Sequence, residues 1–437
     1  MRRTLVTLAC LGAVATVAAC GSETGQPTGS DNNANTQQQT TAAPEPVAKT
    51  ADPPQAFDAA KPVAIPIEGV KTNMAGNVTS SFLTLRDRTA YIVTPKGMAA
   101  VDILTGKQTW TVPFEGTPGD PYNQSGPFVN TTGPRPPAVT DKLVAAAVPI
   151  KMPEQGTTPS YPALSVIAAD PAGKKAWQVN IKIPADQYAD ANDAITKVVA
   201  VTDKAVIATY NRKGDNVITV ALDPATGKTI WDHKDYDAGS VYGNVVVGTD
   251  YNVAENSSMT QATALDVATG EQKWAGALRS LDLTVFPSDP GLVAVYHSDY
   301  GTTDPYLLFL DAATGAEKGK VSGKGQYEKS AFSCDYDQQS VLLCSSMANG
   351  LVGYDAKTGK ELWSLPDQAS GRVQPQVSVV WHGVVYGKTN GGTPITLDGK
   401  TGKDISTDVG AAPYWVSKYG GIGVDKDGVP LAYPVKQ

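Results

Sequence analysis

Residues 266–274 read Asp-Val-Ala-Thr-Gly-Glu-Gln-Lys-Trp, and this short stretch decides the fold because the chain repeats it. Apolar and polar side chains alternate just before Asp266, which predicts a half-buried strand. Asp and Thr side chains can bond nearby backbone amides, and Gly270 suits the left-handed backbone of a tight turn. Trp274 then falls on the next strand, where its large flat ring can fill a wedge between neighbouring units.

The pattern Asp-x-x-Thr-Gly, followed by Trp, occurs seven times with some substitutions. The copies at Asp311 and Asp398 keep the Thr-Gly turn but have Gly319 and Ser406 where the tryptophan belongs. One copy would indicate an ordinary hairpin turn, whereas seven copies in register indicate a repeat architecture. The copies that keep both the aspartate and the tryptophan are Asp102 with Trp110, Asp170 with Trp177, Asp223 with Trp231, Asp266 with Trp274, and Asp355 with Trp363.

The spacing of these aspartates defines the repeat unit. Successive aspartates are 68, 53, 43, 45, 44 and 43 residues apart. Four strands of about eleven residues, with their turns, account for the last four spacings, and this period predicts the blade of a β-propeller. In the third unit the expected strands are Thr196–Thr202, Lys204–Tyr210, Val217–Asp223 and Thr229–His233.

The repeat resembles the PQQ-type repeat of bacterial quinoprotein propellers, and the resemblance covers nearly everything after Lys61. It implies an all-β propeller. The chain ends in three expected strands, at 414–418, 421–424 and 429–435, without a fourth. We expect Val63–Ile67 to supply the outer strand of this last blade, because closure removes exposed sheet edges. The prediction is an eight-bladed propeller, and seven blades are the alternative.

The N-terminus is typical of an exported lipoprotein. Arg2 and Arg3 precede an uncharged apolar run at residues 5–19, which is too short to span a bilayer as a stable helix. Small residues before Cys20 resemble the bacterial lipobox, which implies a signal peptide at residues 1–19 and a lipid on Cys20. The alternative is an ordinary signal peptide with an incidental cysteine.

A lipidated, disordered tether is expected over residues 20–60, before the propeller at 61–437. Its large apolar residues are only Val47 and Phe57, so it cannot bury enough surface to offset its ordering entropy. This organisation predicts a protein that is lipid-anchored at the extracytoplasmic face of a cell membrane. The sequence leaves open whether that membrane is the cytoplasmic or the outer one.

Charge and cysteine content restrict the partners further. The net charge of -7 argues against binding to nucleic acid or to an anionic membrane surface. Export places Cys334 and Cys344 in an oxidising compartment, where we expect them to form a disulfide across a hairpin that turns near Gln339. Two buried thiols are the alternative. We expect a monomer.

Catalytic patterns are not evident in the sequence. Quinoprotein dehydrogenases, which share the repeat, carry adjacent cysteines beside a quinone cofactor and calcium, but this chain has no adjacent cysteine pair. No histidine pair has metal-ligand spacing, and the neighbours at 297–299 cannot form a catalytic triad because its members must converge through the fold. Residues 425–428 resemble half a calcium loop but favour a tight hairpin turn. We therefore expect no catalytic residue, cofactor or metal.

The remaining hypothesis is a non-catalytic scaffold that binds a protein or a ligand at the cell envelope. Propeller lipoproteins of outer-membrane barrel assembly and PQQ-repeat sensor domains of receptor kinases have similar repeats, while an enzyme or cofactor carrier is the alternative. Long irregular loops should form a binding face on one side of blades 2 to 5, since function is often carried by such loops on a rigid scaffold. The alternative is that these loops have diverged in sequence and bind no partner. The loops are Glu115–Pro137, Pro149–Pro162, Asp250–Gln261 and His297–Pro305, and the candidate binding residues are Tyr122, Tyr161, Tyr251, His297 and Tyr300.

We predict that Cys20 carries the lipid anchor. Replacing it (Cys20→Ala) removes the thiol that takes the diacylglycerol, so the protein should be released into the medium or remain as an uncleaved precursor. Partition between detergent and aqueous phases measures the effect. An unchanged detergent-phase fraction for the variant would contradict this assignment.

Overall fold

The computed structural model describes the chain from Ala48 onward, with gaps, and Ala48–Gln437 forms one compact unit. Cys20, Tyr122 and Tyr300 lie outside the described residues. Among the described residues, no helix is long and apolar enough to cross a membrane. The described ranges are 48–66, 83–94, 96–118, 133–134, 136–183, 194–212, 216–252, 259–298, 305–323, 332–346, 349–425 and 429–436.

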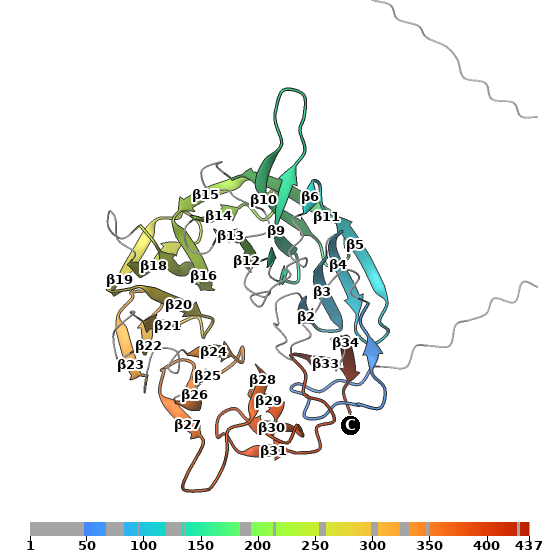
Figure 1. Cartoon of the computed structure of the whole chain (residues 1–437), viewed down its shortest axis with the longest axis vertical. Helices are drawn as coiled ribbons and strands as arrows, with labels where there is room; N and C mark the ends of the chain where they lie inside the picture. Colours follow the sequence, from blue (N-terminus) through green and yellow to red (C-terminus); the bar gives the residue numbers. More distant parts are fainter. Residues whose placement is uncertain are drawn as a thin grey trace, which may run out of the picture. The chain divides into compact units, whose positions relative to one another are not determined.

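The described strands form eight sheets, which follow one another around a central axis as the blades of a propeller (Figure 1). The all-β, eight-bladed prediction is confirmed. Blade 1 contains β2 (Leu83–Arg86), β3 (Thr89–Thr94), β4 (Gly97–Asp102) and β5 (Gln108–Pro113); blade 2 contains β6 (Thr117–Pro118), β8 (Ala138–Val139), β9 (Val144–Met152), β10 (Tyr161–Ala169) and β11 (Lys175–Lys182); blade 3 contains β7 (Gly133–Pro134), β12 (Ile195–Val201), β13 (Val206–Arg212), β14 (Asn216–Leu222) and β15 (Thr229–Lys234); blade 4 contains β16 (Tyr236–Tyr242), β17 (Val245–Asp250), β18 (Thr260–Asp266) and β19 (Gln272–Ser280).

The second half of the ring repeats the four-stranded plan. Neighbouring strands within each of these blades are antiparallel, and the fourth strand lies at the outer rim (Figure 1). Blade 5 contains β20 (Asp282–Phe286), β21 (Leu292–Ser298), β22 (Tyr306–Asp311) and β23 (Glu317–Ser322); blade 6 contains β24 (Ser333–Tyr336), β25 (Val341–Ser346), β26 (Gly350–Asp355) and β27 (Glu361–Leu365); blade 7 contains β28 (Gln376–Trp381), β29 (Val384–Lys388), β30 (Pro394–Asp398) and β31 (Asp404–Ser406); blade 8 contains β32 (Trp415–Ser417), β33 (Gly420–Val424), β34 (Pro430–Pro434) and β1 (Val63–Ala64).

The last blade takes its outer strand from the N-terminal side of the chain. Val63 and Ala64 of β1 pair antiparallel with Ala432 and Leu431 of β34, as the sequence predicts. The strand is shorter than expected because it ends at Ala64, and Ile67 lies outside the described residues. Ring closure therefore joins the two ends of the folded unit in one sheet.

The two faces of the propeller carry different connections. Because the strands of a blade alternate in direction, the turn between its first two strands and its Thr-Gly turn lie on one face, which we call the turn face. The connection between the second and third strands and the link to the next blade lie on the opposite face, the loop face. One ion pair agrees with this division. The Lys142 ammonium, in the first turn of blade 2, lies 3.1 Å from a carboxylate oxygen of Asp203, in the first turn of blade 3.

The repeated aspartate shapes the Thr-Gly turn of its blade. In blade 3 an Asp223 oxygen accepts hydrogen bonds from the amides of Ala225 and Thr226 and from the Thr226 hydroxyl, at 3.1, 2.8 and 2.8 Å. These bonds, with that from the hydroxyl foremost, lower the pKa of the Asp223 carboxyl. The aspartate therefore fixes a local turn and does not project a free carboxylate.

The repeated tryptophan joins its blade to the turn of the next one. The Trp274 indole N–H donates to the Ala312 carbonyl at 2.9 Å, and a Cβ added to Gly315 of that turn would lie 2.6 Å from the ring. Only glycine leaves room for the ring there, and its φ of +71° also favours glycine. The equivalent donations run from Trp110 to Pro171, Trp177 to Pro224, Trp231 to Val267, and Trp363 to Gly399, at 3.1, 2.9, 3.0 and 2.7 Å. Burial varies among the five tryptophans: the side chains at 177, 231 and 274 are buried, and those at 110 and 363 are partly buried.

Blade 5 lacks the tryptophan but keeps an aromatic wedge. Phe309 on β22 lies directly opposite Gly319, whereas a small residue on the third strand faces each of the five tryptophans. A Cβ added to Gly359 in the next turn would lie 2.8 Å from the Phe309 ring. The large and small residues have exchanged strands, and the ring still fills the wedge between blades 5 and 6.

Blade 7 also lacks the tryptophan, and here an aromatic ring comes from the N-terminal segment. Phe57 is fully buried in a cluster with Val384, Tyr386 and Val416 of blades 7 and 8. The Phe57 and Tyr386 ring centroids lie 5.9 Å apart. The expectation of a disordered tether up to residue 60 is therefore wrong for residues 48–60, because the packing of one phenylalanine anchors this polar stretch.

Residues 48–58, which we call the clasp, cross the turn face beside the first turns of blades 7 and 8. The Ala51 amide donates to the Lys418 carbonyl at 2.9 Å. His382 Nδ1 lies 2.5 Å from an Asp52 carboxylate oxygen, and the Tyr386 hydroxyl donates to a clasp carbonyl at 2.6 Å. The described chain thus begins on the turn face.

The two remaining cysteines form a disulfide within blade 6. Cys334 and Cys344 face each other on β24 and β25, with Cα atoms 4.1 Å apart, and both are buried. The expected turn near Gln339 separates them. In that turn Asp337 is fully buried, and its carboxylate accepts hydrogen bonds from three amides of its own turn and from the Gly383 amide of blade 7. The turn therefore also fastens blade 6 to blade 7.

We predict that the Phe309 ring stabilises the junction between blades 5 and 6 as a tryptophan does elsewhere. Phe309→Ala should lower the free energy of unfolding by about 3–5 kcal/mol, because it empties a packed aromatic site. Adding Gly319→Trp to this variant returns a ring to the wedge from the usual strand and should recover much of the loss. Urea unfolding followed by far-ultraviolet circular dichroism measures both. Equal stability of the single and double variants would contradict the exchange.

Candidate binding face

The long link between blades 1 and 2 is tied into the sheets at both of its described ends. Its first part forms β6, which pairs with β9, and its later part forms β7, which pairs in parallel with β12 of blade 3. Glu115 at its start pairs with Lys175 at 2.5 Å and exchanges backbone hydrogen bonds with the Gln178 amide group. The middle of the link, with Tyr122, lies outside the described residues. The described ends are therefore not free loops.

The hairpin between β9 and β10 belongs to the described loop face. Its strands are nine residues long, and Figure 1 shows them extending beyond the ring. Tyr161 pairs with Met152 at the base of an exposed tip, residues 153–160. The Tyr161 ring is partly buried, with the Lys182 ammonium 5.3 Å from its centroid. The hairpin thus presents a polar tip with an aromatic side chain at its base.

Tyr251 belongs to a polar network that connects blades 3 and 4. The Asn211 amide donates to one Asp237 oxygen at 2.7 Å, and the Lys197 ammonium lies 3.4 Å from the other. Burial raises the pKa of Tyr251 to about 12, and the negative charge of Asp237 adds to this, while a hydrogen bond with Asn211 opposes it. The network ties neighbouring blades together. This network could not be predicted from the sequence, because single polar residues on strands carry no periodic signal.

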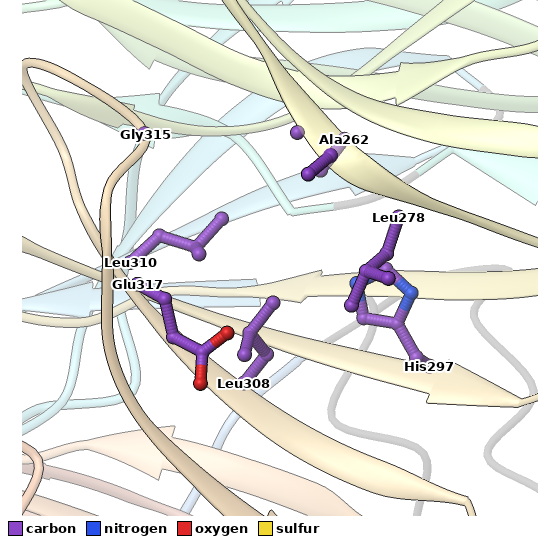
Figure 2. Close-up of a pocket in the computed structure, with 9 residues that line it drawn as sticks. Ala262, Leu278, His297, Leu308, Leu310, Gly315 and Glu317 are labelled. Atoms are coloured by element: carbon purple, nitrogen blue, oxygen red, sulfur yellow. The ribbon is translucent and has the colours of Figure 1, made fainter.

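His297 is buried between blades 4 and 5. Its side chain is 3% exposed and stacks on the Tyr306 ring, with centroids 5.1 Å apart. The Lys320 ammonium lies 3.7 Å from the same tyrosine ring. Figure 2 shows the imidazole beside Leu278 in a small pocket, whose volume is about 80 Å³. Ordinary ligand sites have volumes of about 300–1,000 Å³, so this one is too small for a typical free ligand.

The candidate residues are distributed along the ring. Tyr161, Tyr251 and His297 belong to blades 2, 4 and 5, and Tyr300 lies outside the described residues. Within the described ranges, no group of three or more His, Cys, Asp or Glu side chains could hold a metal ion.

The Asp425 amide donates to the Val429 carbonyl at 3.0 Å and closes the hairpin expected there, although residues 426–428 are not described.

An eight-bladed ring whose blades are joined by aromatic wedges and Asp-x-x-Thr-Gly turns defines a PQQ-type β-propeller. The sequence model of the family described as "Outer membrane protein assembly factor BamB" matches residues 163–321 and 303–414. These segments together span more than half of the chain, and the chain therefore belongs to this family. No curated protein sequence is similar enough to count as a match.

Solved structures with similar folds include designed, assembly and enzyme propellers. The computationally designed Ika8 protein is 14% identical, with 87% of this chain and 100% of that chain covered and a TM-score of 0.51. BamB from Moraxella catarrhalis is 15% identical over 89% of this chain and 94% of that chain, with a TM-score of 0.44. A europium-containing methanol dehydrogenase is 12% identical over 88% and 87%, with a TM-score of 0.44. At such identities the similarity concerns the fold alone.

We predict that Tyr251 does not ionise in the range of an exposed tyrosine. Because burial and the nearby Asp237 charge raise its pKa to about 12, the difference in ultraviolet absorbance between wild type and Tyr251→Phe should stay flat up to about pH 11. The protein must remain folded over this range, which circular dichroism can verify. A tyrosinate signal that is lost in the variant near pH 10 would contradict the inward packing of Tyr251.

Proposed function

We propose that the protein is a lipid-anchored lipoprotein of the cell envelope that acts as a non-catalytic scaffold and binds a partner protein on its loop face. The observation that carries this proposal is that the two faces differ: the turn face carries the short repeated turns, and the loop face carries longer connections. The repeated aspartates, tryptophans and glycines are used in turns and blade junctions. The hairpin between β9 and β10, which extends beyond the ring, belongs to the loop face.

The clasp supports the choice of face. It crosses the turn face at blades 7 and 8, where His382 and Lys418 hold it. The described chain therefore enters the propeller on the turn face, which supports a partner site on the loop face. The family description, an assembly factor for outer membrane proteins, favours an envelope protein as the partner. A cell-wall polymer is the alternative occupant.

The quinone cofactor of related dehydrogenases does not fit the residues of this chain. Those enzymes place a disulfide between adjacent cysteines against the cofactor, whereas Cys334 and Cys344 are ten residues apart and pair across two strands. The charged side chains Lys197 and Asp237 are already paired with each other. We therefore derive no catalytic step. An absorbance spectrum that changes after incubation with PQQ and calcium would favour the enzyme alternative.

We predict that the β9–β10 hairpin is needed for partner binding. Replacing residues 153–160 with Asn-Gly joins the paired residues Met152 and Tyr161 by a two-residue turn, which suits a hairpin. The shortened protein should capture less of its cross-linked envelope partner. Quantitative mass spectrometry of affinity-purified, cross-linked material measures the change.

The matched control alters the turn face. Lys228 and Lys400 are exposed beside the Thr-Gly turns of blades 3 and 7, and Lys228→Glu with Lys400→Glu should leave partner capture unchanged. Circular dichroism verifies that both variants are folded. Loss of capture in this control, together with full capture by the shortened hairpin, would assign binding to the turn face and contradict the proposal.

A further inference from the structure

The small pocket between blades 4 and 5 exists because the outermost strand of blade 4 bulges. In β19, Ala275 faces Thr263 and Arg279 faces Gln261, so that three residues, Gly276 to Leu278, lie opposite Ala262 alone. Such a bulge bends a strand and redirects its side chains. It leaves the Leu278 side chain 38% exposed above the pocket, although most leucines of this fold are buried.

The pocket walls are aliphatic, and a carboxylate stands at the edge. Leu278, Leu308 and Leu310 form the walls, with His297 at one end (Figure 2). Glu317 also lines the pocket and is exposed, and no cation pairs with it in the part of the chain that the structure describes. The chemistry is that of an apolar site beside a free negative charge.

The volume of the pocket limits the size of the group that can bind in it. A cavity of about 150 Å³ is sufficient to hold benzene, so about 80 Å³ corresponds to a single small aliphatic side chain. A free small molecule of that size would gain little affinity, because so few atoms are in contact. A side chain that is part of a longer chain can gain the rest of its affinity from other contacts.

The neighbouring strand edge can supply those contacts. β19 is nine residues long and outermost in its sheet, and no described strand pairs with its free edge. The outermost strands of blades 5, 6 and 7 have six, five and three residues. A long free edge with unpaired backbone groups can accept an extended peptide as an additional strand.

We infer that the β19 edge and its pocket bind an extended segment of a partner protein, with an aliphatic side chain in the pocket and a Lys or Arg two residues away beside Glu317. Residues i and i+2 of a strand point to the same side, which sets this spacing. The charge of Glu317 selects the basic residue. The inference rests on the proposed protein-binding function and names the chemistry of one partner segment.

The experiment uses the purified full-length protein and a fluorescein-labelled peptide, Thr-Ser-Thr-Leu-Thr-Lys-Thr-Ser-Thr. Fluorescence polarisation should show saturable binding. Replacing the peptide leucine with serine should weaken binding about tenfold or more, because the apolar contact is lost. Replacing the peptide lysine with glutamate should weaken binding about fivefold, the upper value for an exposed ion pair.

The variant Glu317→Lys should reverse this preference, so that the glutamate peptide binds better than the lysine peptide. Glu361→Lys is the matched control, because Glu361 holds the same position of the repeat in blade 6, is exposed and does not line the pocket. It should leave both affinities unchanged. Leu278→Thr should weaken both peptides, while Leu362→Thr, at a similarly exposed leucine of blade 6, should not.

The inference is overturned if the peptide does not bind at millimolar concentration, or if Glu317→Lys and Glu361→Lys have the same effect. Failure of this inference can be distinguished from failure of the proposed function, because envelope capture is expected to depend on the β9–β10 hairpin and peptide binding is not. Capture without peptide binding refutes only the inference. Peptide binding by the hairpin-shortened protein, with the Glu317 charge reversal, supports it independently.

Discussion

The structure depends on one repeated interaction, an aromatic ring held in the wedge between two blades by the turn of the next blade. An indole N–H bonds to a carbonyl of that turn, and a glycine without a Cβ lies against the ring, as with Trp274 and Gly315. A larger residue at the glycine would collide with the ring, and a smaller one at the tryptophan would leave a cavity. Five of the eight junctions use this same contact, which ties each of those blades to the next one.

Two of the three junctions that lack tryptophan, those after blades 5 and 7, show that the wedge can be filled by a ring from another source. Phe309 fills one from the neighbouring strand, and Phe57 fills another from the clasp. In the second case, the segment that precedes the propeller becomes part of its core on the turn face. This placement supports the proposal that a partner binds on the loop face.

The sequence predicted the fold closely because its signals are periodic or local. The Asp-to-Asp spacing gave the blades, and the unpaired strand at Val63 gave the ring closure. Single contacts were not predictable. Phe57 is one aromatic residue in a polar segment, and Tyr251 resembles a loop tyrosine although it packs inward. The pocket depends on the register shift at Gly276–Leu278, and no pattern of residues in the sequence predicts that shift.

The stability of Phe57→Ala tests the central claim most directly, because it removes the wedge that comes from outside the repeat. The account predicts that the free energy of unfolding falls by about 3–5 kcal/mol, the usual range for emptying a packed aromatic site. It also predicts that limited proteolysis then cuts within the clasp in the native state, since Phe57 holds that segment. Unchanged stability and a protected clasp would contradict the account.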